Sequence, residues 1–259
     1  MLHRAHLNLV DSSRWFFGLD HKATIEVGEG WLLGAGSPEH PVISNAAFRA
    51  DDALDGEELI ARAKEFFGER GRGFSVWVRA GQPEDEDLIA AAEAAGLATV
   101  YEMPEMILDA PPPNEPTPPG VEVRRLSNAE EAADFWKVAT ESYADIGWPP
   151  EVFASYTENA RLLADNAAVF TAYLDRAPVA IAATLVSHSV AGVYWVGTLK
   201  SARGKGLARR MTATAVEAGL ELGANIASLQ ASPMGRPIYA AMGFKTVYDY
   251  RLMMSPPPA

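Results

Sequence analysis

Residues 201–210, with the sequence SARGKGLARR, place four basic side chains and two glycines in a chain whose formal net charge is −12. The segment follows a strand-like run and precedes a pattern in which Leu207, Met211 and Ala215 recur at helical spacing. Glycines before a helix bind phosphate, because the free N–H groups and the helix dipole favour an anion. No acidic residue occurs between Arg176 and Val216. We therefore predict a ligand that carries phosphate.

Two common phosphate-binding loops do not fit this segment. A Walker loop needs Ser or Thr after Gly-Lys to hold magnesium, and here Gly204-Lys205 is followed by Gly206. A dinucleotide-binding loop needs a third glycine where this chain has Arg209, and it follows a parallel strand, whereas the preceding runs read as antiparallel. The sequence therefore excludes both readings.

The elements that must position this segment follow in a regular order. Ser127 and Glu130 form a capping-box pattern ahead of a helix that runs to about Tyr143, and Pro149-Pro150 suits the first turn of a second helix. Three strand-like runs with short connections predict an antiparallel meander. The expected strands are residues 121–125, 167–175, 178–186, 191–199 and 226–231, followed by a short helix over residues 236–242 and closing strands from residue 244 onwards.

A proline-rich segment divides the chain. Residues 109–120 hold six of the eighteen prolines, a density that favours extended polyproline conformation. The first half repeats the order of elements expected at the end of the second half: a helix, the strand FSVWVR, another helix and a final strand pair. Residues 94–108 also resemble residues 240–254. We predict two similar domains, 1–110 and 121–259, joined by a linker over residues 111–120.

Two separated motifs in the second half resemble those of the GNAT acetyltransferase superfamily. The family pattern Arg/Gln-x-x-Gly-x-Gly/Ala is matched by Arg203, Gly206 and Ala208, and Tyr-x-x-x-Gly-Phe is matched from Tyr239 to Phe244. The resemblance covers residues 121–255. It implies an α+β fold with a mixed, mostly antiparallel GNAT-type sheet flanked by helices, present as two GNAT-like domains in tandem.

The resemblance also implies roles for individual residues. It implies acetyl-CoA as co-substrate, with an acceptor amine attacking the thioester directly and a backbone N–H near Thr198 stabilising the oxyanion. Tyr239 fills the position that protonates the departing thiolate. Ser232 stands where relatives often carry an asparagine. The expected cofactor-binding residues are Val196, Gly197, Thr198, Arg203, Gly204, Lys205, Gly206, Leu207, Ala208, Arg209 and Ser232.

The acceptor side is less defined by the sequence. Trp148 and Tyr194 are candidates for lining an apolar acceptor pocket, with core packing as the alternative for both. His188, Glu141 and Asp145 are the groups considered as a general base, and none of them is assigned that role. The acceptor is expected to be an amine of a small molecule or a peptide.

The first half is predicted to lack the cofactor. Its counterpart of the glycine-rich segment is RADDALDGEEL, ahead of a helix, and it contains Asp51, Asp52, Asp55, Glu57 and Glu58. Five carboxylates would repel a diphosphate in a partly desolvated site. We expect residues 1–110 to form a degenerate partner domain that packs against the catalytic half.

The composition of the chain argues against several other classes of function. The chain has no cysteine, which excludes disulfides and thiol catalysis, and no metal site is predicted. Its acidic balance argues against nucleic acid or anionic membranes as partners, and a cytoplasmic location is expected because no signal-like or spanning run is present. Two functions stay open: an acetyl-CoA-dependent N-acetyltransferase, and a non-catalytic acyl-CoA-binding or sensing module with the same fold.

Overall fold

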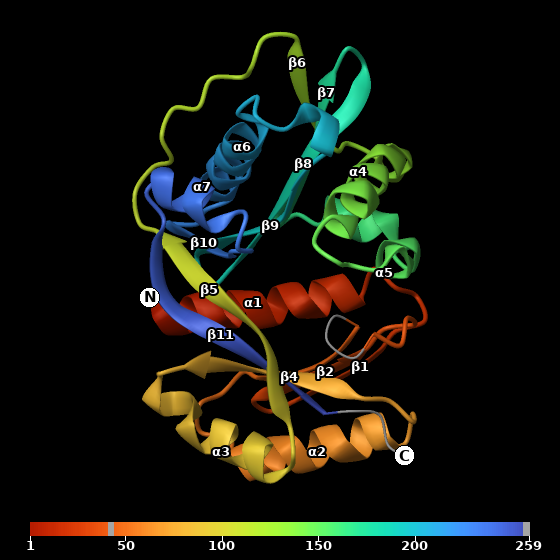
Figure 1. Cartoon of the computed structure of the whole chain (residues 1–259), viewed down its shortest axis with the longest axis vertical. Coiled ribbons are helices and arrows are strands. Elements are labelled where there is room, and N and C mark those ends of the chain that lie inside the picture. Colours follow the sequence, from red (N-terminus) through yellow and green to blue (C-terminus); the bar gives the residue numbers. More distant parts are fainter. Residues whose placement is uncertain (41–43, 256–259) are drawn as a thin grey trace.

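The computed structural model describes residues 1–40 and 44–255. Its strands form one continuous mixed sheet in the order β1-β2-β3-β4-β11-β5-β10-β9-β8-β7-β6, with helices packed on both faces (Figure 1). Within the described residues only β3 with β4 and β9 with β10 pair in parallel, so the sheet is mostly antiparallel. The predicted α+β fold is confirmed.

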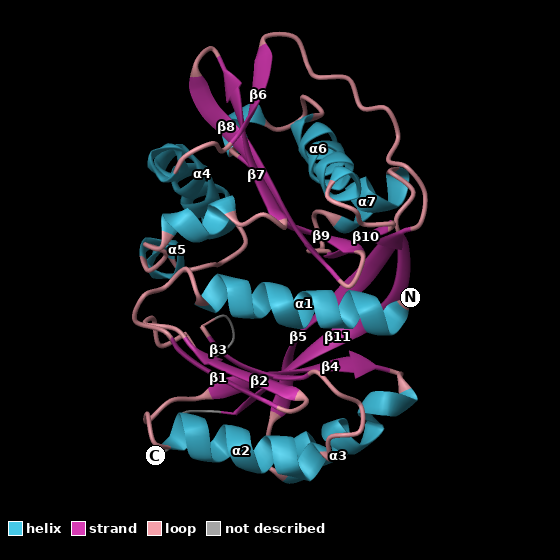
Figure 2. Cartoon of the chain, turned by 180° about the vertical axis from the view of Figure 1, so that it is seen from behind, coloured by secondary structure: helices cyan, strands magenta, loops and turns pink. Residues whose placement is uncertain are grey.

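Where the structure describes it, the first half contains three α-helices and five strands. Helix α1 is long and lies on one face of this half's sheet, while α2 and α3 cover the other (Figure 2). Their buried faces follow the helical period, as with Leu59, Ala63 and Phe66 in α2. The elements are α1 (Leu2–Phe17), β1 (Thr24–Gly28), β2 (Trp31–Ala35), β3 (Asn45–Arg49), α2 (Gly56–Gly68), β4 (Phe74–Ala80), α3 (Glu86–Ala94) and β5 (Ala98–Leu108).

The second half follows the predicted order. The meander of three strands is confirmed, with β7, β8 and β9 pairing antiparallel in sequence order. Helices α4 and α5 lie on one face, and α6 and α7 lie on the other (Figure 1). The elements are β6 (Val121–Arg125), α4 (Ala132–Ala144), α5 (Pro150–Ala154), β7 (Ala167–Leu174), β8 (Ala177–Ser187), β9 (Val190–Thr198), α6 (Leu207–Glu221), β10 (Ile226–Gln230), α7 (Arg236–Ala241) and β11 (Lys245–Ser255).

The two halves exchange their last strands. β5 comes from the first half, but it pairs with β10 and β11, and β11 pairs with β4 of the first half. The expectation of a closing strand pair within each half is therefore wrong. Each closing segment is a single eleven-residue strand without an internal turn, and the other half supplies its partners. The similar segments around residues 94–108 and 240–254 consequently lie side by side.

Helix α1 joins the halves through a buried asparagine. Asn8 is fully buried, and its amide nitrogen donates to the carbonyl oxygens of Leu185 and Val190, both at 3.1 Å. The hydroxyl of Tyr194 donates to its amide oxygen at 2.7 Å. Gly192 permits this contact, because a Cβ there would lie 2.0 Å from the Asn8 oxygen. These contacts fix α1 of the first half against the β8–β9 hairpin of the second.

Candidate functional site

An opening separates β9 from β10 in the middle of the sheet. The two strands pair only where residues 226–228 of β10 meet residues 190–192 of β9, and they diverge beyond that point. Further along β9, its register against β8 is shifted, and Trp195 adopts a positive φ of 50°. Such a bulge bends a strand and leaves backbone groups unpaired with the neighbouring strand. The result is a cleft whose one wall is the end of β9.

The glycine-rich segment forms the floor of this cleft. Gly204 and Gly206 have φ values of 76° and 81°, which only glycine adopts without strain. A Cβ built at either position meets no atom within 4 Å, so this backbone is open to a ligand. Among the described residues, none accepts a hydrogen bond from the backbone N–H groups of residues 204–209, which stand at the start of α6. Free N–H groups and the positive end of a helix dipole fit a diphosphate.

The basic side chains of the segment meet acidic partners that the sequence analysis did not foresee. Arg203 pairs with Asp145 at 2.5 Å and donates from Nε to the carbonyl oxygen of Thr198. Arg209 pairs with Glu115 of the proline-rich segment, whose carbonyl oxygen also accepts from Arg210. Asp145 and Glu115 lie 58 and 94 residues from the arginines they pair with, so the local absence of acidic residues does not reveal them. Arg210 also pairs with the nearby Glu217, at 2.9 Å.

The cleft holds most of the residues expected to bind the cofactor. Those that line it are Val196, Gly197, Thr198, Arg203, Gly204, Gly206, Leu207, Ala208, Arg209 and Ser232, whereas Lys205 does not. The hydroxyl of Thr198 is buried without a hydrogen-bond partner among the described residues. Ser232 accepts a hydrogen bond from the N–H of Gly235 through its hydroxyl, at 3.1 Å. The structure thus brings the two sequence motifs to one cavity.

Tyr239 lies at the other wall of the cleft, on α7. It lines the cavity and is 9% exposed. Burial raises the pKa of its phenol, although a hydrogen bond with Thr212 lowers it in part. The pKa of Tyr143 on α4 is also raised, mainly by burial and to a smaller extent by the nearby phenol of Tyr239. Both groups therefore stay protonated at neutral pH.

The cleft continues into a second part that both halves line, which we call the aromatic arm. The whole cavity has a volume of about 750 Å³. Trp148 and Tyr194, the candidates for the acceptor pocket, line this cavity and also pack in the core. The ring centroids of Phe16 and Trp195 lie 4.5 Å apart. The aromatic side chains that define the arm are Phe16, Phe17, Phe48, Trp77, Tyr101, Tyr143, Trp148, Tyr156, Tyr194 and Trp195.

The residues considered as a general base lie outside this arrangement. His188 sits in the turn after β8 with a φ of 52°, and its Nε2 is 3.1 Å from Asp11. Asp145 is held by Arg203. Neither these residues nor Glu141 lines the cavity.

One buried carboxyl behind the cavity was missed by the sequence analysis. Glu105 of β5 is fully buried, and its Oε2 accepts from the side-chain amide of Gln230, which lines the cavity, at 2.6 Å. Burial raises the pKa of Glu105 to about 8, against the opposing effect of that hydrogen bond. An acidic residue inside the apolar run MPEMIL was the available signal.

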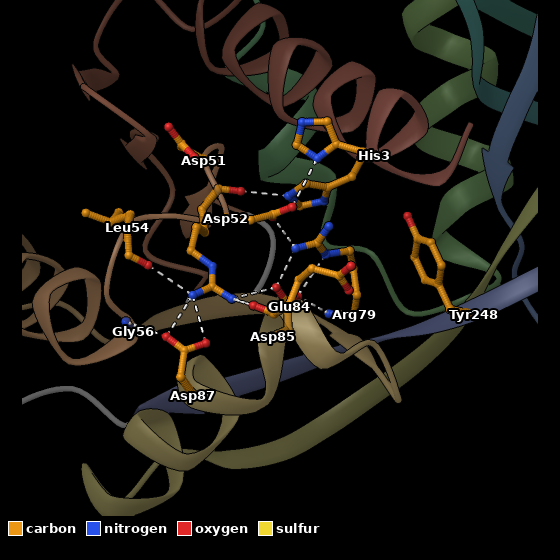
Figure 3. Close-up of polar contacts among 12 residues, drawn as sticks. His3, Asp51, Asp52, Leu54, Gly56, Arg79, Glu84, Asp85, Asp87 and Tyr248 are labelled. Atoms are coloured by element: carbon orange, nitrogen blue, oxygen red, sulfur yellow. Dashed lines mark hydrogen bonds and ion pairs between the residues drawn. The ribbon is translucent and has the colours of Figure 1, made fainter.

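The corresponding place in the first half is occupied by ion pairs. Figure 3 shows Asp52, Asp85 and Asp87 gathered around two guanidinium groups. Arg49, 1% exposed, pairs with Asp85 at 2.8 Å and with Asp87 at 2.9 Å. Arg79 pairs with Asp85 and Asp52, both at 2.6 Å. All three of these carboxylates are therefore paired with a guanidinium group, and Asp52 is the member of the predicted acidic segment that takes part.

The start of α2 is also closed to an anion. Asp55 accepts from the N–H groups of Glu57 and Glu58, and Asp87 accepts from the N–H of Gly56. The N–H groups that stay free in α6 are thus taken by carboxylates in α2. The start of α2 therefore offers fewer free N–H groups to an anion than the start of α6 does.

Comparisons with known proteins agree with this geometry. Residues 117–232 match the family model described as an acetyltransferase (GNAT) domain. A mycothiol acetyltransferase from Thermomonospora curvata is 28% identical over 200 residues, which cover 73% of this chain and 66% of that protein. The chain therefore spans somewhat less than two thirds of the length of this curated relative.

Solved structures match nearly the whole chain. A GCN5-related N-acetyltransferase from Kribbella flavida superposes with a TM-score of 0.70 at 20% identity, over 98% of this chain and 96% of that one. A tandem GNAT protein from the clavulanic acid biosynthesis pathway superposes with a TM-score of 0.64 at 15% identity, over 99% and 94%. Within the described residues, no helix has the length and apolar character needed to cross a membrane. Residues 117–232 therefore match a GNAT acetyltransferase domain, and the chain as a whole shares its fold with a tandem GNAT protein.

Proposed function

We propose that the protein is an acetyl-CoA-dependent N-acetyltransferase whose active site is the cleft of the second half together with the aromatic arm. The observation that carries this proposal is the start of α6, where the N–H groups of residues 204–209 stand free beside the opening between β9 and β10. GNAT acetyltransferases use acetyl-CoA, and the name of the curated relative also describes an acetyl transfer. The donor supplies an acetyl thioester when it is bound.

The residues of this chain would act by positioning and by proton transfer. The N–H groups of residues 204–209 would hold the diphosphate. The diverging end of β9, at Val196, Gly197 and Thr198, would offer backbone groups to the pantetheine arm as an added strand does. A backbone N–H near Thr198 would stabilise the oxyanion that forms on direct attack by the amine. Tyr239, which burial keeps protonated, would donate its proton to the departing sulfur.

The two halves of the chain would have different roles. We propose that residues 121–259 hold the cofactor and that residues 1–110 form a degenerate domain without one. The buried pairs of Arg49 and Arg79 and the capping carboxylates of α2 support this division. Phe16, Phe48 and Trp77 of the first half line the aromatic arm, so this half would complete the acceptor site.

One observation favours the alternative of a non-catalytic acyl-CoA sensor. None of the candidate bases His188, Glu141 and Asp145 lines the cavity. The two functions differ in one measurement, the release of free thiol from acetyl-CoA in the presence of a panel of amines. Transfer to an amine with stoichiometric thiol release is the result expected. Tight acetyl-CoA binding by calorimetry, without release for any amine of the panel, would instead support the sensor.

A further inference from the structure

The aromatic arm has a lining that selects for apolar molecules. Its walls are rings from both halves, among them Phe16, Phe48 and Trp77 of the first half and Trp148 and Trp195 of the second. The rings also contact one another, with Phe16 and Trp195 at 4.5 Å and Phe48 and Trp77 at 5.5 Å between centroids. Stacked rings of this kind offer large apolar surfaces and few hydrogen bonds.

The charged groups of the arm are already engaged or neutral. The titratable side chains among the described residues that line the whole cavity are, apart from the phenols, Arg203 and Arg209 of the glycine-rich segment together with Asp20 and His40. Asp20 accepts from the N–H of Lys22 at 2.9 Å, and from the N–H and the hydroxyl of Ser37, each at 2.6 Å. Burial lowers the pKa of His40, which favours its neutral form. These three hydrogen bonds occupy most of the roughly four acceptor positions of the Asp20 carboxylate, so the arm offers a second amino group few hydrogen bonds.

We infer that the acceptor is an apolar primary amine, in which an aryl or arylalkyl group carries one amino group and no further charge. The inference rests on the proposed function, since it names the substrate class of the same site. Within the arm the ring of the acceptor would pack among Phe16, Trp77 and Trp195, and its amino group would reach the end of β9, where Val196 and Gly197 line the cavity.

The apolar lining also accounts for the missing general base. Moving an ammonium group into an apolar site favours its uncharged form, so the acceptor releases one proton to solvent as it enters. The free amine then forms a bond between its nitrogen and the acetyl carbon while the bond from that carbon to sulfur breaks. The nitrogen then releases its second proton to solvent, and the thiolate takes up a proton from Tyr239. Solvent returns one proton to Tyr239, so the complete reaction releases one proton. The products are the N-acetyl amine and the free thiol.

A matched pair of amines tests this inference on the full-length protein. 2-Phenylethylamine and ethanolamine share an aminoethyl group and differ in a phenyl ring against a hydroxyl. Because burial of an aromatic ring contributes about 1.5–3 kcal/mol, kcat/KM should be roughly 10- to 100-fold higher for 2-phenylethylamine. Ethylenediamine, which carries a second amino group, should be a poor acceptor as well. Equal or better turnover of ethanolamine or ethylenediamine would overturn the inference while leaving acetyl transfer intact.

A variant and a binding measurement separate this inference from the proposed function. Phe16→Ser should lower kcat/KM for 2-phenylethylamine roughly tenfold and so narrow the ratio between 2-phenylethylamine and ethanolamine, whereas Leu2→Ser, at an exposed position of the same helix outside the cavity, should change neither value. Calorimetry with CoA present reports binding without turnover. Binding of 2-phenylethylamine with no transfer to any amine would contradict the transferase and support the apolar site. Failure of 2-phenylethylamine to bind would contradict the apolar site.

Discussion

Tyr239 combines two properties that a proton donor needs in the proposed reaction. It lines the cleft, and burial keeps its phenol protonated at neutral pH. Tyr239→Phe removes the proton and leaves the ring, so we expect kcat to fall on the order of 10²-fold with little change in the Kd for acetyl-CoA. Steady-state kinetics and calorimetry measure the two quantities. Tyr173→Phe is the matched control, because its hydroxyl donates to Asp134 and it does not line the cavity.

The buried Glu105 leads us to predict how the stability of the protein depends on pH. Burial raises the pKa of Glu105 to about 8 in the folded protein, whereas an exposed glutamate titrates near 4.5. The folded state therefore holds this proton more tightly than the unfolded state does. Its contribution to stability is complete below pH 4.5 and is lost as the pH rises through 8. The free energy of unfolding should thus decline over this range by an amount on the order of a few kcal/mol.

Glu105→Gln removes the titration and keeps a group of similar shape. Urea unfolding at several pH values between 5 and 8.5 gives the free energy of unfolding against pH. This free energy should decline less with pH for the variant than for the wild type. Glu102→Gln, on the exposed part of the same strand, should keep the wild-type slope of free energy against pH, since Glu102 is exposed and pairs with the exposed Arg251. Parallel profiles for Glu105→Gln and the wild type would contradict this account.

At the scale of single elements, the starts of α2 and α6 show how one helix position is kept closed or open. In α2, Asp55 caps the helix, and Asp87 takes a further N–H group. In α6 the N-cap is Gly206, which has no side chain to accept those hydrogen bonds. The same helix dipole is thus satisfied internally in one half and left available to a ligand in the other.

Gly206→Glu tests the open helix start. The new side chain brings a carboxylate to the place proposed for the diphosphate, and repulsion at that distance should raise the Kd for acetyl-CoA roughly 10²- to 10³-fold. Gly223→Glu, at the other end of α6, is the control, because Gly223 has a φ of 97° and equal free space around its Cβ. Both variants carry similar backbone strain, so only the first should weaken binding in calorimetry.

Many elements of the second half could be predicted from local sequence. The meander, the glycine turn and the start of α6 depend on periodicity and on glycines within a few residues of one another. The partners of Arg203 and Arg209 could not be predicted, because Asp145 and Glu115 reach them only through the folded chain. The ion pairs of Arg49 could not be predicted either, because Asp85 and Asp87 are also distant from it in the sequence.

At the scale of the whole molecule, the exchange of β5 and β11 makes the folding of each half depend on the other. β5 lies between β10 and β11, so removal of the first half would leave both with unpaired edges inside the sheet. We expect a fragment of residues 119–259 to be insoluble or to lack a cooperative unfolding transition in circular dichroism. Addition of a peptide with the sequence of residues 97–109 should partly restore the fold, whereas a scrambled peptide should not. A soluble, fully active fragment would contradict this view and the proposed role of the first half.

The exchange was beyond sequence reasoning because the two closing segments are alike. Residues 94–108 resemble residues 240–254, and each could complete the sheet of either half by pattern alone. The choice between them depends on the register of β4, β5, β10 and β11, which the local pattern does not encode.

The position of β5 also sets the order in which the protein can be completed during synthesis. Both neighbours of β5 belong to the later half, and β11 ends at residue 255. At 5–20 residues per second, the ribosome needs roughly 7 to 30 s after residue 108 to make that strand. Meanwhile Met106, Ile107 and Leu108, which are buried in the finished protein, have no partner strand. A nascent chain that stalls in this interval therefore presents a bare apolar strand to other chains.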